Sequence, residues 1–384
     1  MDFERKVIEN RRYIHKNPEL GGKEFKTAKF IETKLKELKI PYKRLNATGV
    51  LGVIKGKLSG KTIALRADID ALNICERNDV EYKSQNVGIM HACGHDAHIA
   101  LMLGAAELLN MKKNKLRGNV KFIFQPDEEN SNGAKAMIKA GALKSPQVDF
   151  ILGMHVNPWL KSGKVGFKYG AMMSAVDKIK IEIIGIIAHG AYPHNGKDAL
   201  IAASVFVNIV QSIISREVDP TENAVITFGK IEGGDAYNVI CKNVTLVGTV
   251  RSFSKEVRRL IKTSIIKKIK ALEVAYDVKC KIDYIPIGNA LINTPEITEA
   301  CVKTAKEFYG EKNVEILQKP SMGGEDFAEY LDYVPGNFIY IGTSKDKYTS
   351  YPWHHSNFNI DEAALPKASK YITYTIESLI NCYN

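Results

Sequence analysis

Apolar segments of strand length recur along the first half of the chain, and they constrain the fold more than any other feature. Four of them lie at 50–56, 61–67, 119–125 and 148–156, and helical segments separate the last three. Each is apolar along most of its length rather than alternating, which is typical of strands buried on both faces of a parallel sheet. The sequence therefore predicts an α/β domain whose mostly parallel sheet has helices on both faces.

The pattern changes from about residue 177. Six segments then follow in the order strand, helix, strand, strand, helix, strand, at 177–186, 197–216, 224–233, 242–253, 254–274 and 278–285. This βαββαβ order is that of a small α+β sandwich. We therefore expect a discontinuous domain of residues 1–176 and 287–384, interrupted by an inserted α+β domain of residues 177–286.

Composition excludes several classes of protein. The chain is 45% hydrophobic and 25% charged, which is typical of a globular protein and excludes disorder. We find no apolar stretch of about 18 residues and no apolar leader, so we expect no membrane association and a cytoplasmic location. The six cysteines are scattered, which is typical of reduced thiols. The net charge of +11 comes from dispersed lysines, which disfavours a nucleic-acid partner but suits anionic small substrates.

The segment HACGHDAH, residues 91–98, carries the sharpest chemical signal. Cys93 and His95 flank a glycine just before a helix, where both side chains can turn toward one point. A thiolate and an imidazole suit a borderline-soft divalent metal. In isolation the segment is more often simply a buried cysteine and a histidine that begins a helix.

Other candidate ligands follow the ends of strands. Glu128 and Glu129 come directly after the strand at 119–125, and His155 ends the strand at 148–156. Ligands bind at the carboxyl ends of strands in α/β sheets, so these side chains can meet. One carboxylate can bind metal while its neighbour takes a proton from water. In a later loop, either His354 or His355 can reach the same place.

Further polar candidates lie at a Gly-Gly turn and in the inserted segment. Gly324, in GGEDF, can bring backbone N–H groups close to a ligand, although the turn could equally be a helix cap. His189 lies in a loop, where it can donate to an oxyanion or be a surface residue. Asn238 and Arg251 complete the set, and Arg251 can bind a substrate carboxylate through two hydrogen bonds or form an ordinary ion pair.

Taken together, eight segments resemble peptidase family M20, most closely its amidohydrolase subfamily. In chain order they are RADIDAL, HACGHDAHIALMLGAA, FQPDEEN, GMHVNP, AHGAYPHNGKDA, GTVRSF, GGEDFA and HHSNFNIDE. The resemblance covers nearly the whole chain, from residue 15 to beyond residue 362. Members include N-acyl-amino-acid amidohydrolases, hippurate hydrolases, N-acetyldiaminopimelate deacetylases and auxin-conjugate hydrolases.

The resemblance implies a metal-dependent hydrolase that cleaves the amide bond of N-acyl-L-amino acids. It implies two divalent ions per subunit (Mn²⁺, Zn²⁺, Co²⁺ or Ni²⁺) and a homodimer formed through the inserted lid domain. Glu128 matches the general base, Asp70 the acid that orients the site, and His189 a histidine that reaches the partner's active site and polarises the scissile carbonyl. Asn238, Arg251 and Gly324 are the expected substrate-binding residues. The implied metal ligands are Cys93, His95, Glu129, His155 and His354.

Two other functions compete with this one. A dipeptidase or carboxypeptidase of the same family would use the same metal chemistry on peptides. A non-catalytic metal- or peptide-binding protein would also explain the ligands, but it has no need of Glu128 as a spare base beside them.

Overall fold

The computed structural model describes residues 2–382. Within them the chain divides into two compact units. The first contains residues up to 170, 292–319 and those from 326 onward. The second contains residues 171–291 and 320–325, so it begins before residue 177 and takes in a short later segment.

An eight-stranded sheet forms the centre of the first unit, in the order β1-β2-β4-β3-β5-β14-β6-β13. The four strands in the middle, β4, β3, β5 and β14, are parallel to one another. This confirms the mostly parallel sheet predicted from the apolar segments. The strands span β1 Tyr42–Leu45, β2 Gly49–Lys55, β3 Leu58–Asp68, β4 Arg117–Gln125, β5 Phe150–Lys161, β6 Val165–Phe167, β13 Val314–Ile316 and β14 Gly336–Ser344.

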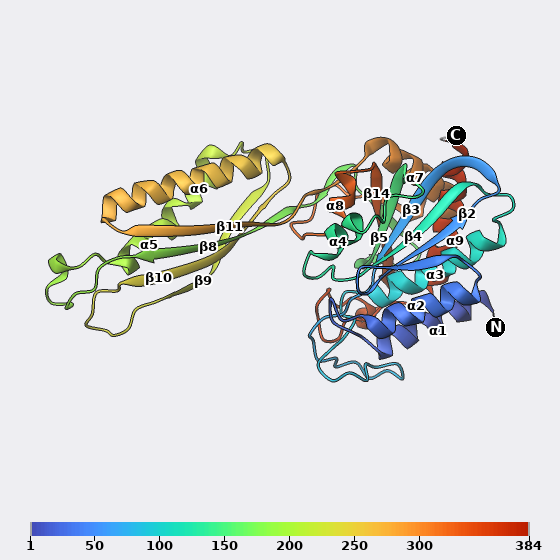
Figure 1. Cartoon of the computed structure of the whole chain (residues 1–384), viewed down its shortest axis with the longest axis horizontal. Coiled ribbons are helices and arrows are strands. Elements are labelled where there is room, and N and C mark those ends of the chain that lie inside the picture. Colours follow the sequence, from blue (N-terminus) through green and yellow to red (C-terminus); the bar gives the residue numbers. More distant parts are fainter. Residues whose placement is uncertain (1, 383–384) are drawn as a thin grey trace. The chain divides into compact units, whose positions relative to one another are not determined.

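Helices cover both faces of this sheet (Figure 1). Along β3, Ile63, Leu65 and Ala67 face the apolar core that α3 and α9 cover. Arg66 points to the opposite face, where the short helices α4 and α8 contact each other. The helices of this unit span α1 Phe3–Lys16, α2 Phe25–Glu37, α3 His95–Met111, α4 Gly133–Lys139, α7 Pro295–Tyr309, α8 Ala328–Leu331 and α9 Ala364–Cys382.

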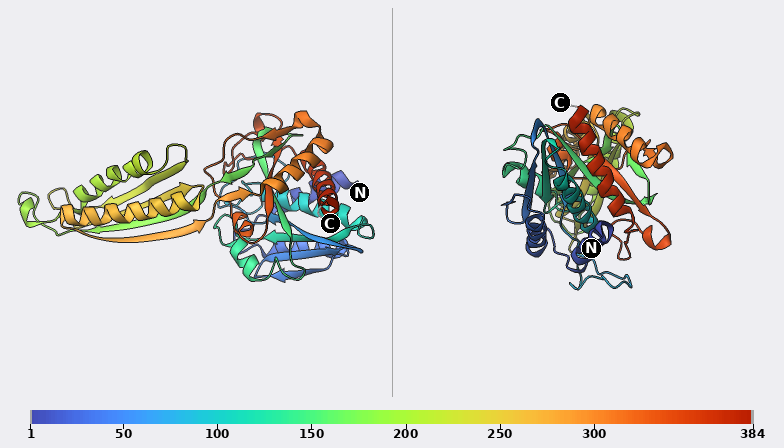
Figure 2. Two further views of the ribbon diagram at one scale, coloured as in Figure 1. Left: turned by 90° about the horizontal axis from the view of Figure 1, so that it is seen from above. Right: turned by 90° about the vertical axis from the view of Figure 1, so that its right-hand side faces the viewer.

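The second unit has an antiparallel four-stranded sheet in the order β11-β8-β10-β9. Helices α5 and α6 lie side by side on one face of it (Figure 2). On β8, the residues Ile179, Ile181 and Ile183 alternate into the core beneath the helices. The elements span β8 Ala175–Ile184, α5 Ala199–Ile209, β9 Ala224–Gly233, β10 Asn243–Ser252, α6 Lys255–Tyr276 and β11 Lys279–Gly288, and the connecting strands are β7 Gly170–Met173 and β12 Leu291–Asn293.

One helical stretch in the described residues, Ala199–Glu217, is long and apolar enough to cross a membrane by length and composition. The sequence had suggested no such stretch. Its buried residues Ala202, Ala203 and Phe206 belong to the core of the second unit. Packing against the sheet therefore explains part of its apolar composition, since a third of the apolar window is buried.

The topology of the first unit also decides where polar side chains gather. Because β3, β4 and β5 are parallel, their carboxyl ends meet at one edge of the sheet. Asp70, Glu128 and Glu129 follow the ends of β3 and β4, and α3 begins with His95 at the same edge. His155 lies within β5 just beyond the last pair that this strand forms with β3, Arg66 and Gly153; the expected strand end at residue 156 is wrong, because β5 continues to Lys161 alongside β14.

Candidate metal centre

Cys93 and His95 are brought together by a tight turn at Gly94. Gly94 has a positive φ of 92° and is the N-cap of α3. A Cβ atom at this position would lie 2.3 Å from the Val156 Cγ2 atom, so any other residue would be strained by the positive φ and would have to displace the Val156 side chain. The glycine therefore allows the residues on both sides of it to project into one place.

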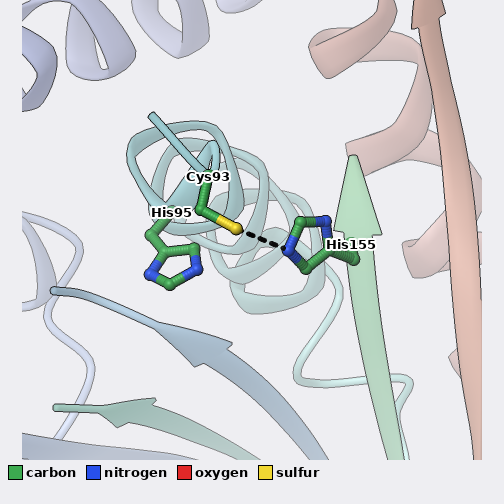
Figure 3. A group of neighbouring side chains, drawn as sticks. All are labelled: Cys93, His95 and His155. Carbon is green, nitrogen blue, oxygen red and sulfur yellow. Dashed lines mark hydrogen bonds between the residues drawn. The ribbon is translucent and has the colours of Figure 1, made fainter. Parts of the chain in front are cut away.

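The thiol and two imidazoles form the buried part of the cluster. The Cys93 Sγ atom points toward His155 and lies 3.4 Å from its Nε2 atom (Figure 3). One ligand atom from each of Cys93, His95 and His155 lies within 4.8 Å of the others, and all three residues are buried. Sequence analysis predicted these three residues as ligands, and the structure brings them together.

Two further predicted ligands complete the cluster on its open side. His354 Nε2 lies 3.4 Å from the Glu129 Oε1 atom, and both lie near the Cys93 sulfur. Its neighbour His355 instead stacks on Tyr351, with ring centroids 4.7 Å apart. The structure therefore brings His354 to the cluster, while the His355 ring lies against Tyr351. Glu128, the predicted base, approaches His95 and Glu129 to within 4.8 Å.

The donor atoms are arranged as a bound cation requires. His95 Nε2 and Glu129 Oε1 are buried, 3.9 Å apart and without a hydrogen-bond partner in the described part of the chain. Two atoms that bind one ion at about 2.0–2.3 Å lie at most about 4.6 Å apart. Leaving such atoms unpaired is costly unless something binds them. A thiolate, three imidazoles and carboxylates therefore fit a divalent transition metal here.

Burial sets the protonation of the two ligands in contact. Burial, together with the nearby Glu129 carboxylate, raises the pKa of the Cys93 thiol well above its usual value. Burial and the neighbouring His98 ring lower the pKa of His155, so this imidazole is neutral. Its Nδ1 atom donates to the Val156 carbonyl at 2.8 Å, which leaves the Nε2 lone pair free for a ligand bond. A cation that binds Cys93 has to displace the thiol proton.

Asp70 supports two ligands at once. Its carboxylate accepts a hydrogen bond from the backbone N–H of Glu129 at 3.0 Å, and its other oxygen lies 3.1 Å from His95 Nδ1. The predicted orienting acid is therefore in contact with both residues that it would orient.

A buried polar network lies beneath the cluster: sequence analysis expected His98 to support the ligands or to pack, but it missed the contacts of Arg66 with Asp68 and Asp326. His98 lies 2.5 Å from Asp68 through Nδ1 and accepts the Val156 N–H at its Nε2 atom. Arg66 donates to Asp68 and to Asp326, at 2.8 and 2.6 Å. His98 thus has both ring nitrogens occupied and supports the strand that carries His155. The signal that could have revealed this network is an arginine inside the otherwise apolar strand KTIALRA.

A second buried network, which sequence analysis also missed, joins helix α1 to the start of α3. Arg11 and His15 of α1 both contact the Asp96 carboxylate, at 2.7 and 2.8 Å. His15 also lies 3.1 Å from Glu76. Burial opposes the charge on Asp96, but Arg11 and His15 outweigh it and hold its pKa far below the usual range. Asp96 follows His95 directly, so α1 anchors the loop that carries the ligands.

The other four predicted residues lie in the second unit. The backbone N–H of Gly190, next to His189, donates to the Asn238 carbonyl at 2.7 Å, which joins their two loops. Arg251 lies beside Gly324, since a Cβ atom at that glycine would be 3.7 Å from an Arg251 guanidinium nitrogen. Within this unit the loop of His189 therefore contacts Asn238, and Arg251 lies close to Gly324.

An α/β sheet with thiol, imidazole and carboxylate groups converging at its carboxyl edge defines a metal-binding protein of the hydrolase type. The chain belongs to peptidase family M20/M25/M40, whose family model matches residues 64–378. This confirms the resemblance seen in the motifs.

Two named relatives and a solved structure support the same family assignment. An N-acetyl-L-cysteine deacetylase of Bacillus subtilis (strain 168) is 41% identical over 99% of this chain and 89% of its own. A hippurate hydrolase of Campylobacter jejuni is 37% identical, over 97% of this chain and 96% of its own. The YXEP protein of Bacillus subtilis, described as a dinuclear metal-binding peptidase of the M20 family, superposes with a TM-score of 0.86. It is 34% identical, and the match covers 99% of this chain and 98% of that one. The protein is therefore a metal-dependent amidohydrolase of this family.

Proposed function

We propose that the protein hydrolyses the amide bond of N-acyl-L-amino acids, using two divalent cations and Glu128 as general base. The observation that carries the proposal is the convergence of Cys93, His95, Glu129, His155 and His354 beside Glu128. The relatives named for N-acetyl-L-cysteine and hippurate support an N-acyl amino acid as the substrate class.

The chemistry divides between the cations and the protein. Divalent cations held by the five ligands would polarise the acyl carbonyl and lower the pKa of water toward about 7. Glu128 accepts the proton of the attacking water and passes it to the departing amine, so the products are a carboxylate and a free amino acid. The Cys93 thiolate favours Mn²⁺, Zn²⁺, Co²⁺ or Ni²⁺ over Ca²⁺ and Mg²⁺.

The second unit would supply the groups that bind substrate. His189 Nδ1 accepts the N–H of Ala191 at 3.0 Å, so its proton resides on Nε2, which can donate to an oxyanion. Arg251 is half-buried, and no ion pair to it occurs among the described residues. Its guanidinium beside Gly324 suits a free substrate carboxylate, with Asn238 as a further polar contact.

We also propose that two chains associate through this inserted domain. Strand β9 is an edge strand, and on α5 the apolar side chains Leu200, Ile201 and Ile209 are exposed. Open strand edges and exposed apolar helix faces are common contact surfaces between subunits. Light scattering should give the mass of a dimer, and Ile201→Lys should shift it toward the monomer. A monomeric wild-type protein would contradict this assembly.

The test of the function is hydrolysis of a substrate panel. N-acetyl, N-benzoyl and indoleacetyl amino acids, N-acetyldiaminopimelate and dipeptides would be offered to enzyme stripped by a chelator and then given Mn²⁺, Zn²⁺, Co²⁺ or Ni²⁺ separately. Metal-dependent release of a free amino acid from N-acyl substrates is expected. Turnover of dipeptides alone would instead favour a dipeptidase, and no turnover by metal-loaded enzyme would overturn the proposal. Cytoplasmic location is part of the same proposal, and cell fractionation checks it.

A further inference from the structure

An exposed tryptophan lies one aromatic ring away from the candidate metal cluster. Trp159 lies on β5 four residues after His155, and 61% of it is exposed. The pairing of β5 with β14 shifts in register between Asn157 and Lys161, so strand alternation does not decide which way Trp159 faces. The contacts of its ring place it instead.

A second tryptophan links this ring to the cluster. The Trp353 ring meets the His155 ring edge to face, with centroids 4.9 Å apart. Its indole N–H donates to the Val156 carbonyl at 3.0 Å, which fixes its orientation. Trp353 also directly precedes His354, so it contacts one candidate metal ligand and is the chain neighbour of another.

Trp159 is held against Trp353 while its outer surface stays open. The two rings are 4.5 Å apart at an interplanar angle of 80°. The Asn157 Oδ1 atom accepts the backbone N–H groups of Trp159 and Leu160, at 2.9 and 3.2 Å, and so fixes the local backbone. The two indoles, which we call the tryptophan platform, thus offer a rigid aromatic surface one ring away from a metal ligand.

We propose that the tryptophan platform receives an aromatic ring of the substrate, so that ring-bearing N-acyl amino acids are preferred to small ones. The inference rests on the proposed amidohydrolase function and deepens it. Aromatic rings stack favourably on one another beyond the gain from burying their area, and a rigid indole loses little entropy on binding. The ring can belong to the acyl group or to the amino-acid side chain.

The test compares kcat/KM for N-acetylalanine, N-benzoylalanine and N-acetylphenylalanine. Wild-type enzyme should favour at least one ring-bearing substrate. Trp159→Ala should lower kcat/KM for that substrate about tenfold, mainly by raising KM. The kcat/KM for N-acetylalanine should stay within about twofold of the wild-type value. Trp159→Phe should retain most of the preference. The substrate whose kcat/KM falls shows whether the ring belongs to the acyl group or to the amino-acid side chain.

Tyr13→Ala is the matched control, because Tyr13 is an exposed ring that stacks on Phe30 at the same 4.5 Å separation, on helix α1. It should change none of the three values. If Trp159→Ala lowers kcat/KM equally for all three substrates, or leaves the preference unchanged, this inference is overturned while the proposed function stands. Failure of the wild-type enzyme to hydrolyse any of them would overturn the proposed function, and this inference with it.

Discussion

His95 is held by Asp70 through two separate oxygens. The His95 Nδ1 atom lies 2.9 Å from the Asp70 carbonyl oxygen and 3.1 Å from its Oδ1 atom. Nδ1 therefore acts as the donor, and the Nε2 atom faces the Glu129 Oε1 atom 3.9 Å away. The same carboxylate also bonds the backbone of Glu129, so one side chain sets the positions of two candidate ligands.

Loss of the Asp70 carboxylate should weaken metal binding. Asp70→Ala keeps the backbone contact to His95 but removes both carboxylate contacts, so metal affinity should fall about 10–100-fold. Asp70→Asn keeps one acceptor oxygen, so its metal affinity should lie between those of the wild-type protein and Asp70→Ala. Competition with a chromophoric chelator measures the affinity, and an unchanged value for Asp70→Ala would show that Asp70 does not support the ligands.

Adjacent histidines should respond differently to substitution. His354→Ala removes an Nε2 atom 3.4 Å from Glu129 and should reduce the metal bound per chain. His355→Ala removes a ring that stacks on Tyr351 and accepts the Asn357 N–H, so metal content should stay at the wild-type level. Elemental analysis of both purified variants decides between them, and the reverse pattern would refute the ligand assignment.

The network of His15 predicts a pH-dependent contribution to stability. Burial and Arg11 oppose protonation of His15, but Asp96 and Glu76 outweigh them and raise its pKa. A histidine whose folded pKa is raised stabilises the protein below its unfolded value of about 6.5, and this contribution is lost as the pH rises through the folded pKa. His15→Gln should therefore lower Tm more at about pH 5.5 than at about pH 8.5. Thermal unfolding of chelator-treated protein measures this, and an equal loss at both values would contradict the assignment.

Much of the candidate site could be predicted because its residues follow the ends of apolar strands. The strand at 119–125 ends shortly before Glu128 and Glu129, and parallel neighbours bring such ends together, so the sequence predicts both carboxylates at this edge of the sheet. His155 reaches the same edge from within its strand, because β5 does not end at residue 156 as expected but continues to Lys161. The turn at Gly94 was visible for the same reason, since a glycine between two potential ligands permits a sharp turn.

Other features depend on contacts that spacing does not encode. His354 and His355 have the same side chain and nearly the same position in the chain. Only the backbone, with a positive φ of 63° at His354, directs one of them to Glu129. Arg11 resembles any helix arginine in sequence, yet it is fully buried against Asp96, more than eighty residues later in the chain. Such long-range pairs follow from how α1 packs on α3, and not from local pattern.

The most direct test of the mechanism pairs turnover with metal content in Glu128→Gln. Gln keeps the shape of Glu128 but cannot take a proton, so the variant should bind two metal ions per chain and lose about 10²–10⁴-fold in kcat. Glu129→Gln, its neighbour and control, should instead lose metal. A Glu128→Gln enzyme that holds its metal and hydrolyses an N-acyl amino acid at the wild-type rate would contradict the central claim that Glu128 is the general base.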